Sequence, residues 1–230
     1  MSYTAVILAG GLGTRLRSVV SDRPKPMADV SGRPFLDYLV ARLFLNEITK
    51  VLICVSYMRE NIISFFEKKY GDAISFSIEE TPLGTGGALA KASPLLPKSF
   101  LVLNGDTYLP LDYRKLVTFH SEKQADLTIV LSRSTGSQFG RAAINSNERV
   151  VGFGELITPS GLVNAGLYQM EHKVVEMFPI GIAFSLEKEF LPKFVSTGKV
   201  YGYVSEEKFL DIGSPESYLS LLQNGDILKK

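Results

Sequence analysis

A glycine-rich segment near the start of the chain is the first candidate for chemistry. The run Leu8–Leu16 reads LAGGLGTRL, so an apolar stretch leads into three glycines, a threonine and Arg15. Backbone N–H groups approach phosphate oxygens closely where no side chain holds them off, and an arginine adds a fixed positive charge. The residues expected to contact a nucleotide here are Leu8, Gly10, Gly11, Gly13, Thr14 and Arg15.

Two commoner phosphate-binding loops do not match this segment. A dinucleotide fingerprint needs a glycine where the chain has Leu16, and a P-loop ends in Gly-Lys-Ser/Thr rather than in Gly13-Thr14-Arg15. The first mismatch argues against a dinucleotide-dependent oxidoreductase. A glycine-rich turn with a surface arginine stays open as the simpler alternative.

A lysine held between two prolines follows in the segment Arg23–Met27, which reads RPKPM. Each proline restricts the backbone around it, so the position of the Lys25 ammonium is fixed more closely than in an ordinary loop. A fixed cation beside a phosphate loop suits a transition state that gains negative charge on phosphorus oxygens. The alternative is a rigid loop whose lysine is merely solvated.

Two aspartates follow apolar runs far apart in the sequence. Asp106 follows Phe100–Leu103, and Asp211 follows Phe209-Leu210. Both are therefore expected at the carboxyl ends of strands on one sheet edge, where open α/β sheets bind ligands. One or two carboxylates plus phosphate oxygens suit Mg²⁺. A turn aspartate at 106 and a helix-capping network over 211–214 are the alternatives.

These motifs, taken in order, resemble those of the sugar-1-phosphate nucleotidyltransferase family. The glycine-rich segment and the lysine segment look like its signature, and a base-binding loop, two sugar-binding elements and two metal sites follow. The resemblance covers nearly the whole chain. The matching segments are Gly10–Leu16, Pro24–Pro26, Pro82–Ala88, Leu103–Asp106, Asn164–Tyr168, Ser185–Glu187 and Asp211–Pro215.

The resemblance implies a reaction in which the phosphate oxygen of a sugar 1-phosphate attacks the α-phosphorus of a nucleoside triphosphate. Pyrophosphate leaves, and no covalent enzyme intermediate is expected. The implied catalytic residues are Arg15, Lys25 and Asp106, with Mg²⁺ held by Asp106 and Asp211. The base-binding residues would be Glu79, Pro82, Gly84 and Thr85. The acceptor site would comprise Asn104, Gly140, Glu155, Asn164, Gly166 and Glu187.

The chain departs from the family in the acceptor site. Many members place a lysine for the sugar phosphate directly after the position of Glu155, but this chain has Leu156. Another cation must then hold that phosphate. Arg141 and Lys188 are the candidates.

One acid bears on the choice of base. The resemblance places Glu79 at the base edge, where a carboxylate only accepts hydrogen bonds. Guanine offers adjacent N1–H and N2–H donors, so Glu79 favours GTP, unless it is a solvated acid at a strand end. The segments Asp22–Ala28 and Pro34–Leu36 resemble a short bacterial branch that uses GTP and D-glycero-D-manno-heptose 1-phosphate. A hexose 1-phosphate enzyme using GTP, UTP or dTTP is the alternative.

Composition sets broad limits. The chain has 230 residues and a formal net charge of +1, which gives no charge footprint for nucleic acid or an anionic membrane. No apolar run approaches the roughly 18 residues of a membrane helix, and the N-terminus does not read as a signal peptide, so a cytoplasmic location is expected. Cys54 is predicted to be a buried hydrophobe, and His120 and His172 to be surface residues. A homo-oligomer is one candidate assembly.

The elements that must position these residues alternate in the first half. Strand-like runs over 5–8, 51–55, 75–78, 100–103 and 127–131 alternate with helix-like runs that start near 35, 62, 86 and 116. The helix-like run 86–96 should end before Pro97. This order predicts an α/β fold with a Rossmann-like, mostly parallel mixed sheet flanked by helices.

The second half is richer in strands, over 141–144, 150–153, 163–170 and 200–204, and Ser214-Pro215 should start a last helix. We expect a single domain with a nucleotide-binding half, 1–131, and an acceptor-binding half, 132–230. A regulatory protein that binds nucleotide-sugars without activity is a further alternative. It could have lost the charged residues, yet Arg15, Lys25, Asp106 and Asp211 are all present.

Overall fold

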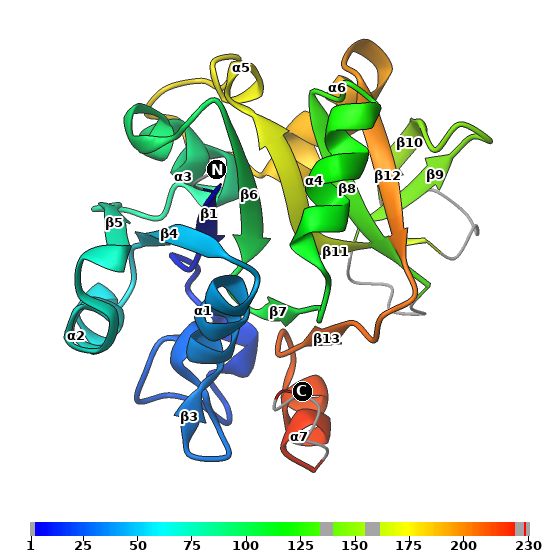
Figure 1. The fold of residues 1–230 in the computed structure, drawn as a ribbon. Coiled ribbons are helices and arrows are strands. Elements are labelled where there is room, and N and C mark those ends of the chain that lie inside the picture. The colour runs from blue at the N-terminus through cyan, green and yellow to red at the C-terminus, as the bar shows by residue number, and fades with distance from the viewer. Residues whose placement is uncertain (1–2, 134–139, 155–161, 224–227, 229–230) are drawn as a thin grey trace.

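The structure, a computed structural model, describes residues 3–133, 140–154, 162–223 and 228. Within these residues, nine strands form one mixed sheet in the order β10-β9-β11-β6-β1-β4-β5, with β8 and β12 continuing from β11 (Figure 1). The strands are β1 (Tyr3–Leu8), β4 (Ile48–Val55), β5 (Ile74–Ile78), β6 (Ser99–Asn104), β8 (Leu127–Ser132), β9 (Arg141–Ile144), β10 (Val150–Gly154), β11 (Val163–Glu171) and β12 (Val200–Ser205).

The first half contributes a parallel block to this sheet. β1 pairs in parallel with β4 on one side and with β6 on the other, and β4 pairs in parallel with β5. The chain thus moves outward from β1 to β5 and then crosses back to β6. This reversal puts a topological switch point between β1 and β6, which is where sheets of this kind bind ligands.

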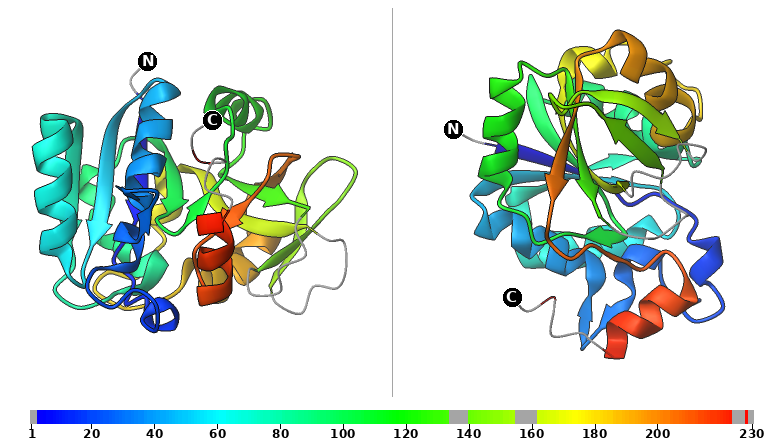
Figure 2. Two further views of the ribbon diagram at one scale, coloured as in Figure 1. Left: turned by 90° about the horizontal axis from the view of Figure 1, so that it is seen from below. Right: turned by 90° about the vertical axis from the view of Figure 1, so that its right-hand side faces the viewer.

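Helices cover both faces of the sheet, as the two directions of view in Figures 1 and 2 show. Alternate residues of β1 enter different cores: Ala5 and Ile7 pack with α1, α2 and α4, whereas Val6 packs with α3, α5 and α6. Burial on both faces explains why β1 is apolar from Ala5 to Leu8. The helices are α1 (Phe35–Leu45), α2 (Arg59–Tyr70), α3 (Gly84–Ala92), α4 (Tyr113–Glu122), α5 (His172–Val175) and α6 (Leu191–Thr197).

The second half joins the sheet through β11, which runs antiparallel to both β6 and β8. β8 and β12 pair in parallel, and β9 and β10 form an antiparallel pair. Among the described residues, no helix is long and apolar enough to cross a membrane.

Short elements complete the fold near the switch point. Two-residue strands pair as β2 (Asp29–Val30) with β3 (Arg33–Pro34) and as β7 (Thr107–Tyr108) with β13 (Leu210–Asp211). Helix α7 (Pro215–Gln223) lies beside β2–β3, because the Tyr218 hydroxyl donates to the Asp29 carbonyl at 2.6 Å (Figure 2). Single turns are η1 (Thr14–Leu16), η2 (Lys25–Met27), η3 (Gly71–Ala73), η4 (Ser93–Leu95) and the π-turn η5 (Leu186–Phe190).

The predicted fold class is confirmed, and the structure corrects three details. The helix expected to run from 86 to 96 ends at Ala92, because η4 replaces its last turn at Pro94. His120, predicted at the surface, is only 5% exposed and bonds to Thr128 at 2.8 Å. It lies one helical turn after Leu116 on the buried face of α4. His172 is half-buried. The division at residue 131 stays a prediction.

Candidate active site

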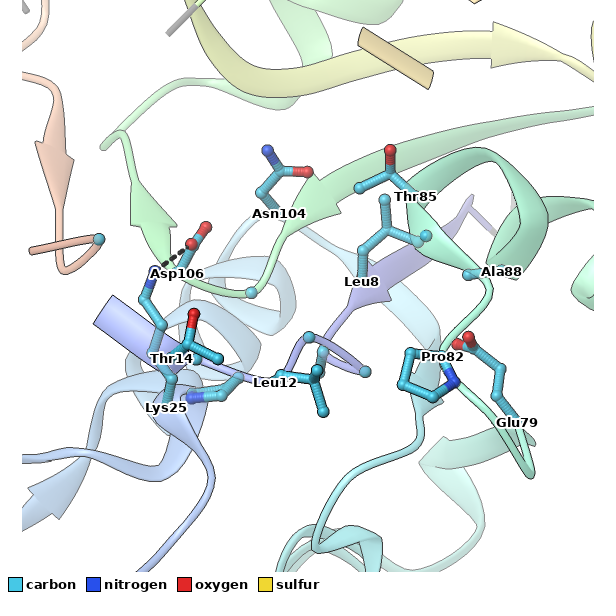
Figure 3. A pocket seen from close by; sticks show the side chains of 18 of the residues that line it. Leu8, Leu12, Thr14, Lys25, Glu79, Pro82, Thr85, Ala88, Asn104 and Asp106 are labelled. Atoms are coloured by element: carbon cyan, nitrogen blue, oxygen red, sulfur yellow. Dashed lines mark hydrogen bonds and ion pairs between the residues drawn. The ribbon is translucent and has the colours of Figure 1, made fainter. Parts of the chain in front are cut away.

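A cavity of about 420 Å³ opens at the carboxyl ends of β1 and β6, at the switch point. Figure 3 shows the side chains that line it. It brings together the glycine-rich segment, the lysine segment, the predicted base-binding loop and the first aspartate. Its lining residues are Leu8, Ala9, Gly10, Gly11, Leu12, Gly13, Thr14, Arg15, Lys25, Pro26, Glu79, Pro82, Gly84, Thr85, Ala88, Asn104, Gly105, Asp106 and Gly213.

The glycine-rich segment leaves β1 and turns into η1 beside the lysine. Gly13 has φ +60°, and a Cβ there would lie 2.8 Å from the Lys25 Cβ, so a larger residue would be strained and would push the two loops apart. Leu16 is 1% exposed and anchors η1 to the core, while Thr14 and Arg15 are exposed. The buried Leu16 therefore holds η1 in place, and the polar side chains of Thr14 and Arg15 are exposed next to it.

Lys25 is held at the start of η2 and reaches across to the end of β6. Its Nζ lies 2.5 Å from Oδ2 of Asp106, and the two side chains are 10% and 31% exposed (Figure 3). The proline-bracketed lysine is thus not a solvated surface cation. It forms part of the charged end of the cavity.

Asp211 lies near Asp106, but the element that places it there could not be predicted from the sequence. It lies in β13, which pairs with β7 rather than with the central sheet, so its expected position on a strand of that sheet is wrong. The Ile212 N–H donates to the Asp106 carbonyl at 3.0 Å, which ties the two aspartate segments together.

The carboxylate of Asp211 is oriented by its own neighbours. The Gly213 N–H donates to its Oδ1 at 2.8 Å, and the Ser217 hydroxyl donates to its Oδ2 at 3.4 Å. Burial, together with the negative charge of Asp106, raises the pKa of Asp211 from 3.8 to about 6, against the opposing charges of Lys25 and Arg15. A carboxylate that is costly to ionise beside a second one is a place where a cation is favoured.

These two carboxylates fit a magnesium ion. No cluster of three or more His, Cys, Asp or Glu side chains with metal-binding geometry occurs in the described ranges. Mg²⁺ does not need one, since it binds through one or two carboxylates, substrate phosphates and water. Asp106 and Asp211 would hold the ion, and their backbone bond keeps them together.

Glu79 lies at the opposite end of the cavity, directly after β5. It is 3% exposed, and its Oε2 accepts the Leu83 N–H at 2.9 Å. Its Oε1 is buried with no hydrogen-bond partner among the described residues, and burial raises the pKa of the carboxyl. A Cβ on Gly10 would lie 2.9 Å from that oxygen. Glu79 is therefore a buried acceptor at the cavity wall and not a solvated acid.

The predicted acceptor residues that the structure describes lie on several elements: Asn104 ends β6, Asn164 and Gly166 lie on β11, Glu187 lies on η5, and Gly140 directly precedes β9. Asn104 lines the cavity, and its Oδ1 is buried without a partner in the described part of the chain. Oδ1 of Asn164 accepts the Gly166 N–H at 3.0 Å, and the Asn164 N–H donates to the Gly140 carbonyl at 2.9 Å. Glu155 and Leu156 lie outside the described residues.

Thr85 lines the cavity as expected, but its hydroxyl bonds to the acceptor side. It donates to Oε2 of Glu187 at 2.6 Å. Tyr168 and Ser217, which orient other site residues, were not predicted. Tyr168 had a detectable signal, because Asn164, Gly166 and Tyr168 are spaced two residues apart and are separated by the apolar residues Ala165 and Leu167. Ser217 had none, since it lies within a helix whose register only the structure fixes.

The topology and the cavity at the switch point are those of an α/β enzyme that binds a nucleotide. Solved structures agree with this class. The crystal structure of HddC from Yersinia pseudotuberculosis complexed with GMP-PN is 38% identical, with a TM-score of 0.84 over 97% of this chain and 99% of that one.

The sequence comparisons define the family. A model described as Nucleotidyl transferase matches residues 4–225. The chain is 39% identical over 217 residues to D-glycero-alpha-D-manno-heptose 1-phosphate guanylyltransferase of Aneurinibacillus thermoaerophilus, covering 93% of this chain and 94% of that protein. It is 37% identical to mannose-1-phosphate guanylyltransferase of Mycobacterium tuberculosis, covering 94% of this chain but 62% of that protein. The chain belongs to the nucleotidyl transferase family, and the predicted enzyme class is confirmed.

Proposed function

We propose that this enzyme transfers GMP from GTP to D-glycero-D-manno-heptose 1-phosphate, which gives GDP-heptose and pyrophosphate. Two similarities support the substrates: the Aneurinibacillus relative is named for this acceptor, and the Yersinia structure holds the guanine nucleotide GMP-PN. Both proteins match this chain over nearly their whole length. A cytoplasmic location is part of the proposal.

The observation that carries the choice of base is the buried Oε1 of Glu79, which has no hydrogen-bond partner within the described ranges. A buried acceptor left unpaired costs about 1–3 kcal/mol, so a ligand that donates to it is favoured. Guanine presents two adjacent donors, whereas uracil and thymine present one N–H between two carbonyls. The further residues proposed to contact the nucleotide are Leu8, Gly10, Gly11, Gly13, Thr14, Pro82, Gly84 and Thr85.

The charged end of the cavity suits the transfer step. An oxygen of the sugar phosphate attacks the α-phosphorus, the bond to the bridging oxygen breaks, and pyrophosphate leaves with the electron pair. Lys25 and Arg15 place positive charge where the phosphorus oxygens gain negative charge. Mg²⁺, when bound by Asp106 and Asp211, would supply further neutralisation of the phosphate oxygens.

The acceptor would lie along β6, β11 and η5. Amide and carboxylate side chains there are suitable partners for sugar hydroxyls. The residues proposed for this role are Asn104, Gly140, Glu155, Asn164, Gly166 and Glu187. Because Leu156 replaces the usual lysine, we assign the sugar phosphate to Arg141 or Lys188.

A mannose 1-phosphate guanylyltransferase is the second candidate. It is favoured by the Mycobacterium relative, whose identity to this chain is nearly as high as that of the heptose enzyme. The two candidates share the nucleotide and differ only in the acceptor.

A substrate panel tests the proposal. GTP, ATP, UTP and dTTP are each combined with heptose, mannose and glucose 1-phosphates, and pyrophosphate release is measured with Mg²⁺. We expect the highest kcat/KM for GTP with D-glycero-D-manno-heptose 1-phosphate. Higher kcat/KM with mannose 1-phosphate would select the second candidate, and strong turnover of dTTP with glucose 1-phosphate would contradict both.

A further inference from the structure

The base-binding loop is docked against the segment that carries Glu187. The Phe184 N–H donates to the Leu83 carbonyl at 2.9 Å, and the Gly86 N–H donates to the Phe184 carbonyl at 3.1 Å. Gly84 has φ +72°, and a Cβ there would lie 2.5 Å from the Phe184 carbonyl oxygen. The two backbones therefore meet without room for a side chain, and a shift of one segment displaces the other.

A side-chain contact reinforces this docking. The Thr85 hydroxyl donates to Oε2 of Glu187 at 2.6 Å and accepts the Leu186 N–H at 2.8 Å. Thr85 thus belongs to the cavity wall by position but is bonded to the acceptor segment. The Ser185 hydroxyl also donates to Oε2 of Glu187, at 3.1 Å.

The other oxygen of Glu187 is bonded to the central sheet. The Tyr168 hydroxyl donates to Oε1 of Glu187 at 3.2 Å and accepts from Nδ2 of Asn164 at 2.7 Å. Tyr168 is 0% exposed, so its hydroxyl has no access to bulk water. Both oxygens of Glu187 are consequently held, one from α3 and one from β11, with lone pairs left for a ligand.

We infer that Thr85, Glu187 and Tyr168 form a hydrogen-bonded bridge that couples nucleotide binding to acceptor binding. A nucleotide that fixes the Pro82–Thr85 loop fixes the carboxylate of Glu187, and through Tyr168 the amide of Asn164, before the sugar arrives. Less ordering is then left to the acceptor, which binds more tightly. Thr85 and Tyr168 are positioning residues. The inference rests on the proposed function, which assigns Glu187 and Asn164 to the acceptor.

A binding cycle without turnover measures this coupling. The affinity of D-glycero-D-manno-heptose 1-phosphate is determined by calorimetry with and without saturating α,β-methylene GTP, whose α-phosphorus cannot release pyrophosphate. Mannose 1-phosphate serves as the second probe. The ratio of the two affinities is the coupling factor, and by reciprocity the acceptor raises nucleotide affinity equally. We expect a factor of about 5–50 in the wild type, within the usual range.

Two conservative variants remove the bridge from opposite sides. Thr85→Val keeps the shape of the side chain but loses the donor to Glu187, and Tyr168→Phe removes only the hydroxyl. We expect each to lower the coupling factor to about 1–3, and in Tyr168→Phe, which alters no proposed nucleotide contact, the nucleotide affinity alone should change less than about threefold. The double variant should lose no more than the larger single loss, since both act on one carboxylate.

Matched controls separate the bridge from general damage. Tyr113→Phe alters another fully buried tyrosine, on α4, and Thr197→Val alters a threonine at the end of α6. Both should keep the wild-type coupling factor. A coupling factor retained in Thr85→Val and Tyr168→Phe, or near 1 in the wild type while both ligands bind, overturns the inference alone. Failure of the wild type to bind either sugar phosphate would contradict the proposed function instead.

Discussion

The charged end of the cavity, called the phosphate end below, and the acceptor side beside the cavity, called the acceptor end, are built differently. At the phosphate end, charged side chains stand on short irregular segments: Arg15 on η1, Lys25 on η2 and Asp211 on β13. At the acceptor end, Tyr168 on the long buried strand β11 donates to the Glu187 carboxylate, and Asn164 on the same strand donates to the Tyr168 hydroxyl, so these groups that hold the carboxylate are uncharged. Under the proposed function, the phosphate end supplies charge to the reacting centre, whereas the acceptor end supplies hydrogen bonds that select the ligand.

This difference predicts where substitutions act. Charge that matters mainly in the transition state lowers kcat when it is removed, whereas lost contacts to a bound ligand raise KM. Substitutions at the phosphate end should therefore change turnover, and those at the acceptor end should change binding. The substitutions described below test whether effects on turnover and effects on binding separate in this way.

Lys25→Ala should have a large effect, confined mainly to turnover. We expect kcat to fall about 10²–10³-fold while the affinity for GTP falls less than about fivefold, as for other groups that stabilise developing charge. Steady-state kinetics with a separate GTP titration measure both values, and Lys68→Ala on the exposed face of α2 is the control. An unchanged kcat, or a loss confined to GTP affinity, would contradict the proposal that Lys25 stabilises negative charge in the transition state.

Asp211→Asn should lower the rate of pyrophosphate release and raise the free energy of unfolding. The raised pKa of Asp211 means that the folded carboxyl keeps a proton that the unfolded chain releases between pH 3.8 and about 6. Stability therefore falls as the pH rises through that window, and the full cost of ionisation is present above it. The asparagine variant should be more stable by about 1–3 kcal/mol at pH 7.5, and nearly equal to the wild type near pH 4.

Urea unfolding in EDTA at both pH values measures this difference, with pyrophosphate release as the second readout. EDTA matters because a bound cation would stabilise the wild type and hide the cost. A variant that is less stable at pH 7.5, or one that keeps wild-type turnover, contradicts the account of Asp211.

Glu79→Gln should have a smaller effect, confined to the base. An amide offers one acceptor and one donor group in place of two acceptor oxygens, so one guanine donor loses its partner. We expect kcat/KM for GTP to fall about 10–100-fold, which corresponds to about 1.4–2.7 kcal/mol. The ratio of kcat/KM values for GTP and dTTP should narrow by a similar factor. An unaltered ratio would show that Glu79 does not select the base.

The sequence predicts the parts of the fold that carry long patterns. β1, β4 and β6 carry continuous apolar runs over 5–8, 51–55 and 100–103, because both faces of these runs are largely buried. The strands of β7 and β13 have two residues each, too few for any periodicity, yet they unite the two aspartates. Helix α6 was not predicted. Its Pro192 lies in the first turn, where no N–H is needed, so this proline is compatible with the helix.

The candidate site divides in the same way. The glycines, Lys25 and the aspartates were predictable because each belongs to a motif with a charge or a spacing of its own. The bond from Thr85 to Glu187 joins residues that are 102 positions apart, so no local pattern encodes it. Side-chain pairing across the site depends on how α3 packs on η5, which only the folded chain determines.

The most direct test of the account is the magnesium dependence of pyrophosphate release in the wild type and in Asp106→Asn. Asp106 lies just after the end of β6. Its carboxylate pairs with Lys25, and its carbonyl accepts the N–H of Ile212, which follows Asp211. With GTP and the preferred sugar 1-phosphate, we expect EDTA to abolish release in the wild type and the variant to lose about 10³-fold or more at saturating Mg²⁺. Wild-type release in EDTA, or a variant within tenfold of the wild type, would contradict a metal-assisted transfer at this cavity.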